Sequence, residues 1–99
     1  MIKGVKYALE AAPWQYSGPG AWVFVSLPVE LSEEIRGLFK TEEEGWGRLK
    51  VTAAVGKSEW KTAIWFDIKS STYILPLKAA IRSKENIITG KPITLTIWI

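Results

Sequence analysis

Hydrophobic and polar residues alternate with a period of two along much of this chain, a pattern typical of strands that are buried on one face. Between Lys61 and Ile68, for example, Ile64 and Phe66 share one face, and we expect both in the core together with Leu95 and Ile97. Clusters of glycine, proline and serine predict tight turns between the alternating stretches. These stretches are residues 5–11, 48–55, 61–68 and 93–99.

Two shorter apolar runs, residues 21–27 and 72–75, bring the predicted total to about six strands. The turn cluster at residues 17–20 lies between the first alternating stretch and the run 21–27, so we expect these two strands to form a hairpin. Many short strands at close spacing favour a small β-barrel over a parallel sheet.

A strand, a Leu-Pro pair and a helical stretch occur twice. The first copy carries Leu27-Pro28 and Ile35-Arg36, and the second carries Leu75-Pro76 and Ile81-Arg82. Each proline fits the first turn of a helix, where its missing N–H is not needed. The copies begin about half the chain length apart, so we expect two short helices and an internal pseudo-twofold repeat within a single domain, residues 1–99.

The first helix has a predicted cap and a predicted buried face. Ser32 is expected to cap its N-terminus, and an apolar stripe is expected to face the core. Residues 41–47 then read as an exposed acidic loop, and Asn86 suits the end of the second helix because it tolerates the left-handed conformation. The stripe consists of Leu31, Ile35, Leu38 and Phe39.

Composition narrows the class of protein. Thirteen basic against ten acidic residues give a net charge of +3, and the basic residues are scattered rather than clustered. The absence of cysteine excludes a disulfide framework, and we see neither a signal peptide nor an apolar run long enough to cross a bilayer. We therefore expect a cytoplasmic domain without a membrane segment. Six tryptophans in 99 residues are unusual.

Four segments of the chain resemble the uncharacterised family DUF1905, a domain of unknown function. The segments are residues 22–28, 59–67, 73–82 and 88–95, which together cover much of the chain. The resemblance implies a double-split β-barrel, the fold shared with AbrB-like, MazE-like and MraZ-like transcription factors. It also implies relatives fused to YdeI-type domains associated with bacteriocin protection.

This sequence departs from the usual pattern of that family at two positions. Ala63 stands where a serine is common, and Lys91 stands where an aspartate often follows the glycine. No role of those side chains in relatives is carried over. The family has no established activity, so the resemblance implies a fold and no mechanism.

The residues offer little for catalysis. Without histidine there is no imidazole triad and none of the usual zinc or transition-metal sites. The run Glu42–Glu44 lacks the glycine and asparagine spacing of a calcium loop. We expect no enzyme, no metal and no cofactor.

Two tryptophans and three cations are the candidate binding residues. Trp65 and Trp98 lie on the faces opposite the apolar ones of their strands, where they either complete the packing or line a groove. Lys78 and Arg82 share one helix face, where they are either solvated, with Arg82 paired to Glu85, or hold an anion.

The sequence thus predicts a non-enzymatic binding module. A small anionic or aromatic ligand is the leading hypothesis, with Lys78, Arg82 and Arg36 as the cationic contacts beside the indoles. Nucleic-acid binding, by analogy with AbrB-like barrels, is the first alternative. A structural or protein-interaction domain anchored by Trp65 or Trp98 is the second. The oligomeric state is left open.

Overall fold

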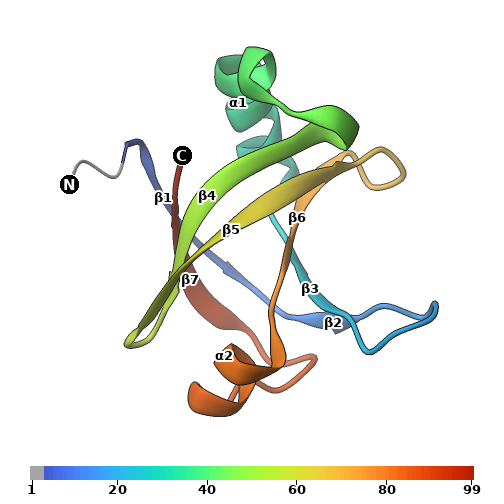
Figure 1. Cartoon of the computed structure of the whole chain (residues 1–99), viewed down its shortest axis with the longest axis vertical. Helices are drawn as coiled ribbons and strands as arrows, with labels where there is room; N and C mark the ends of the chain where they lie inside the picture. Colours follow the sequence, from blue (N-terminus) through green and yellow to red (C-terminus); the bar gives the residue numbers. More distant parts are fainter. Residues whose placement is uncertain (1–3) are drawn as a thin grey trace.

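A computed structural model describes residues 4–99, which form one curled, half-barrel sheet of antiparallel strands with two short α-helices (Figure 1). The predicted mainly β fold is therefore confirmed. The strand order is β1-β7-β4-β5-β6-β3-β2. The elements are β1 (Lys6–Ala11), β2 (Trp14–Gln15), β3 (Val23–Ser26), α1 (Val29–Phe39), β4 (Arg48–Val55), β5 (Ser58–Asp67), β6 (Thr72–Pro76), α2 (Ala79–Lys84) and β7 (Ile93–Trp98), with 3-10 turns η1 (Lys40–Glu42) and η2 (Gly45–Gly47).

The two ends of the sheet are consecutive in the chain. β1 and β2 are separated only by Ala12 and the buried Pro13, and proline interrupts a strand because it has no N–H to donate. β1 pairs with β7, whereas β2 pairs with β3 through Trp14 and Phe24. Because the chain forms β1 and β2 on either side of Pro13, the sheet has seven strands instead of the six expected. This division also makes the predicted hairpin wrong for β1, because only β2 lies beside β3.

The pairing of β3 with β6 reveals the internal repeat. Val25 and Leu75 are partners at the centre, and the N–H of Leu27 donates to the carbonyl of Tyr73 over 2.9 Å. The matching bond, from the N–H of Leu77 to the carbonyl of Val23, is also 2.9 Å. A twofold axis through this strand pair exchanges the two bonds. It relates the unit β1/β2–β3–α1–β4 to the unit β5–β6–α2–β7, as the sequence repeat predicts.

The structure aligns the two units differently from the sequence motif. The β3–β6 register matches Leu27 with Leu77 rather than with Leu75. Pro28 stands just before α1, as expected, but Pro76 is the last residue of β6 and α2 begins three residues later. The second Leu-Pro pair is thus part of a strand and does not open a helix.

The core lies inside the curl of the sheet. Ile64, Leu95 and Ile97 are at most 1% exposed, as predicted. Phe66 was expected with them but is only partly buried, since it lies at the end of the sheet. Its ring packs edge-on against Tyr73 at 5.2 Å and lies 3.7 Å below the guanidinium of Arg36.

Helix α1 is fixed to the sheet by a buried serine. Ser32 does not cap the helix, because Pro28 holds that position. It is instead completely buried, and its Oγ accepts a 3.0 Å hydrogen bond from the backbone N–H of Tyr73 in β6. The face of α1 that meets the sheet is centred on Ser32 and Ile35, so Leu38, expected in the core, is exposed.

A second anchor joins the segment after α1 to β6. Residues 41–47 form two 3-10 turns rather than a uniformly exposed loop. Glu43 is half-buried, accepts a hydrogen bond from the hydroxyl of Tyr73 and lies 3.8 Å from Nε of Arg36. Burial, together with this carboxylate, raises the pKa of the Tyr73 phenol, and Arg36 opposes the shift.

We predict that Ser32→Ala lowers the free energy of unfolding by about 1–3 kcal/mol, because it leaves the buried N–H of Tyr73 without its acceptor. Urea denaturation measures the loss. Ser83→Ala, on the exposed side of α2, is the matched control and should change stability by less than about 0.5 kcal/mol. Equal effects of the two substitutions would contradict the anchoring role of Ser32.

We predict a loss of stability at alkaline pH that depends on Tyr73. The folded state holds the phenol proton more tightly than an ordinary tyrosine, whose pKa is 10.0. The resulting contribution to the free energy of unfolding is therefore complete below about pH 10 and disappears as the pH rises further. Urea denaturation between pH 8 and pH 11 should therefore show that the free energy of unfolding falls less steeply with pH in Tyr73→Phe than in the wild type. Tyr16→Phe, at an exposed position, should keep the wild-type decline.

Candidate functional site

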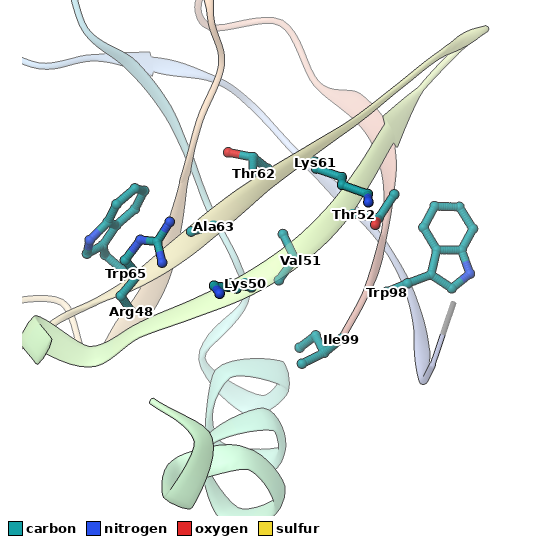
Figure 2. Close-up of a pocket in the computed structure, with 10 residues that line it drawn as sticks. All are labelled: Arg48, Lys50, Val51, Thr52, Lys61, Thr62, Ala63, Trp65, Trp98 and Ile99. Carbon is teal, nitrogen blue, oxygen red and sulfur yellow. The ribbon is translucent and has the colours of Figure 1, made fainter. Parts of the chain in front are cut away.

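A hollow of about 500 Å³ lies on the outer face of β4, β5 and β7 (Figure 2). The alternation of β4 creates its floor, because Leu49, Val51 and Ala53 are buried while Arg48 and Lys50 point outward. We call it the basic hollow. Its lining residues are Arg48, Lys50, Val51, Thr52, Lys61, Thr62, Ala63, Trp65, Trp98 and Ile99.

The predicted tryptophans share this hollow. Figure 2 shows Trp65 and Trp98 at its opposite ends, with the basic side chains between them. The register explains this placement, since Trp65 pairs with Arg48 on one side of β4 and Trp98 pairs with Thr52 on the other. Strand spacing then separates the Cα atoms of Trp65 and Trp98 by about 13 Å along the strands and about 10 Å across them. Both are half-buried.

The cations of the basic hollow differ in how they are compensated. Arg48 lies 5.7 Å from the centre of the Trp65 ring and forms an ion pair with Glu44. Lys50 lies 3.6 Å from the same carboxylate. Lys61 is exposed and forms no ion pair with any residue of the described range 4–99. The ten lining residues include three basic side chains and no Asp or Glu, so the side chains of the hollow favour an anion.

The predicted helix cations lie in an adjoining hollow. Lys78 and Arg82 line a space of about 310 Å³ between the start of α2 and β5, together with Trp22 and Trp60. We call this space the helix hollow. Lys61 lines it as well as the basic hollow and therefore lies between the two hollows. The structure therefore brings Lys78 and Arg82 close to the basic hollow without placing them in it.

Arg82 has a fixed position. Its Nε donates a 3.0 Å hydrogen bond to the carbonyl of Leu77, just before α2. The expected pair with Glu85 is not formed, because that carboxylate accepts a 2.6 Å hydrogen bond from Ser58 at the start of β5. The guanidinium of Arg82 is thus held at the mouth of the helix hollow.

Arg36 is not brought together with the other predicted cations. It lines a different hollow with Glu43, Trp46 and Phe66, and its guanidinium is engaged by the Phe66 ring and the Glu43 carboxylate. Its surroundings are those of a structural residue. The grouping of Arg36 with Lys78 and Arg82 in one site is therefore not what the structure shows.

A third hollow of about 670 Å³, lined largely by aromatic side chains, adjoins the basic hollow and the helix hollow, and the sequence analysis did not predict it. Phe24 is its centre: Trp22 stacks on Phe24 at 6.0 Å with rings only 7° from parallel, while Trp14 and Tyr16 approach at 5.2 and 6.3 Å. Trp22 is 55% exposed and Tyr16 44% exposed. We call this the aromatic surface. Its rings are Trp14, Tyr16, Trp22, Phe24 and Trp65, and the rest of its lining is Gln15, Ser17, Asp67, Lys69, Ile74 and Pro76.

A sequence signal existed for some of the missed residues. The alternation of residues 48–55 already places Arg48 and Lys50 on the polar face of their strand. What it could not supply is the neighbour, because Lys61 and Trp65 join them only through the pairing of β4 with β5. Trp22 lies two residues before Phe24, so alternation also places these two rings on one face. For Trp14, the strand break at Pro13 concealed the pairing of β2 with β3 that brings it beside Phe24.

Within residues 4–99, no three side chains of metal-ligating type come together. The helices of this range also lack the length and apolar character needed to cross a bilayer.

Comparison with known protein families matches residues 10–97 to the family described as Domain of unknown function (DUF1905). The match covers β2 to β6 completely, β7 except for Trp98, and the last two residues of β1. No protein of curated function matches the chain at a significant level. The resemblance of the four sequence segments is thereby confirmed, and the chain belongs to the DUF1905 family.

Proposed function

We propose that this domain is a non-enzymatic binding module that takes an anionic ligand with a flat aromatic group in the basic hollow. One observation carries the proposal: Lys61, without an ion-pair partner among the described residues, faces the same hollow as Trp65. A cation supplies attraction for an anion, and an exposed indole face supplies a stacking surface for a ring.

The size and chemistry of the basic hollow support this proposal. A volume of about 500 Å³ lies within the range of small-molecule sites. Arg48 and Lys50 add positive charge, and because both are shared with Glu44, an incoming anion competes with that carboxylate for them. Lys61 meets no such competition, so we expect it to be the main contact of the anionic group.

The non-catalytic part of the proposal rests on the chemistry of the side chains. The sequence contains no histidine and no cysteine, the residues that most often serve as acid–base groups or activated nucleophiles at neutral pH. The hollow is lined instead by three basic side chains, two threonines, two indoles and aliphatic groups, and it contains none of the His, Asp or Glu side chains that most often act as general bases.

The test uses 1-naphthyl phosphate, which combines both features, with inorganic phosphate and 1-naphthol as its separate halves. Indole N–H signals in two-dimensional NMR spectra report binding. We expect Lys61→Ala to weaken binding of 1-naphthyl phosphate about tenfold, as the loss of one charge-assisted hydrogen bond. Trp65→Ala should weaken binding of 1-naphthyl phosphate but leave the weak binding of inorganic phosphate unchanged.

Lys57→Ala is the matched control, because Lys57 is exposed in the turn of the same β4–β5 hairpin and lines none of the hollows described above. Both lysine variants remove one charge, so a nonspecific effect of net charge would be the same in both. Equal weakening by Lys57→Ala and Lys61→Ala, or no binding of 1-naphthyl phosphate at millimolar concentration, would refute the proposed site.

A further inference from the structure

The two hollows and the aromatic surface form one continuous surface. The basic hollow and the aromatic surface share Trp65, and the helix hollow and the aromatic surface share Trp22 and Pro76. The basic hollow and the helix hollow share Lys61 and Thr62. An extended ligand bound at one of them therefore has the other two beside it.

Stacking positions are repeated along this surface. Trp98 and Trp65 stand at the two ends of the basic hollow (Figure 2), and their Cα atoms are roughly 16 Å apart when the spacings along and across the strands are combined. One ring stacks on an indole at about 4.5–7 Å between centres, so a single ring does not reach both. Beyond Trp65 follow Phe24 and the exposed Trp22, which are stacked on each other. This arrangement suits a ligand with several flat rings in a row.

Positive charge borders the stacking positions on both sides. Arg48, Lys50 and Lys61 lie beside Trp65, and Lys61, Lys78 and Arg82 lie beside Trp22. The one acidic side chain that lines these three hollows, Asp67, already accepts hydrogen bonds from the N–H of Lys69 and the hydroxyl of Ser70. The surface therefore complements an extended anion more closely than the net charge of +3 indicates.

We propose that the ligand of this surface is a single-stranded nucleic acid, which deepens the proposed function and rests on it. A phosphodiester chain offers a row of flat bases with a negative charge at each step, and proteins that bind single strands combine a basic groove with aromatic stacking positions. The phosphates follow Lys61 and its neighbouring cations, and the bases stack on Trp65 and Trp22. Each base presents a ring face, so this mode requires no particular sequence.

A duplex is a poor ligand for the same surface. Its bases are stacked on one another, so their faces do not reach Trp65 or Trp22 until the strand is opened.

The test measures binding of oligothymidylates of 2, 4, 8 and 12 nucleotides by fluorescence anisotropy at low salt. We expect the affinity to rise with length and to level off at about 4–8 nucleotides, given a largest molecular extent of 34 Å. Tryptophan fluorescence should be quenched on binding. The logarithm of the affinity should fall with the logarithm of salt concentration with a slope of about −2 to −3, for three or four phosphate contacts.

Two substitutions of tryptophan separate stacking from general loss of aromatic residues. Trp22→Ala should weaken binding of the eight-nucleotide strand at least fivefold. Trp46→Ala is the matched control, because Trp46 is 93% exposed and lines none of the three parts of this surface. The affinity of this variant for the eight-nucleotide strand should stay within twofold of wild type. Both residues are exposed, and circular dichroism verifies that both variants fold.

Two nucleic-acid controls decide between outcomes. An abasic strand of eight nucleotides carries the charge without the rings, and we expect it to bind at least tenfold more weakly than oligothymidylate of the same length. We expect the matched duplex also to bind at least tenfold more weakly than this oligothymidylate. Equal affinity of either control, or no gain from two to eight nucleotides, overturns the single-strand assignment. If 1-naphthyl phosphate still binds through Lys61 in that case, the proposed function stands alone, whereas failure of both ligands refutes both.

Discussion

The antiparallel pairing of β3 with β6 is the contact on which the rest of this structure depends. Val25 and Leu75 meet at its centre and are completely buried, so the strand pair is fixed by core packing as well as by backbone hydrogen bonds. The chain leaves the two strands in opposite directions and enters α1 at one end and α2 at the other (Figure 1). Each helix begins three residues after the end of its strand, so the two halves continue alike from the symmetric β3–β6 pair.

The same pairing explains why an outer face of the sheet is available for binding. The helices lie at opposite ends of the molecule and leave the outer side of β4 and β5 uncovered (Figure 1). β5 pairs with β4 along eight positions but with β6 only from Trp65 to Asp67. The first half of β5 therefore stands apart from β6, and the helix hollow lies at this separation, with Lys61 at its border.

The positions of Glu43 and Glu44 decide which basic side chains are engaged in ion pairs within the protein. Glu43 holds Arg36 and the buried Tyr73, which joins α1 to the sheet. Glu44 is shared by two cations at one end of the basic hollow. Surface ion pairs of this kind contribute little stability, so their main effect here is on which positive charges remain for a ligand. Lys61 lies away from both carboxylates, and the proposed function follows from that position.

The sequence by itself determined the local structure. Period-two alternation identified the main strands and the inward position of Ile64, Leu95 and Ile97, because one buried face requires that pattern whatever the partner strand is. It also placed Trp65 on the outer face of its strand. Asn86 ends the second helix with a positive φ of 53°, as its short polar side chain allows. The repeat of strand and helix predicted the pseudo-twofold, although its exact alignment was two residues off.

Only the tertiary structure decided which strands are neighbours, and the site depends on that. Pro13 directs β1 to β7 and β2 to β3, so the first strand has two partners where a local pattern predicts one. Arg36 contacts Glu43 and Phe66. Lys61 lies beside the basic face of β4 because β5 pairs with β4. Pairing register is fixed by the sum of many contacts between residues distant in sequence, and no short window of the chain contains that information.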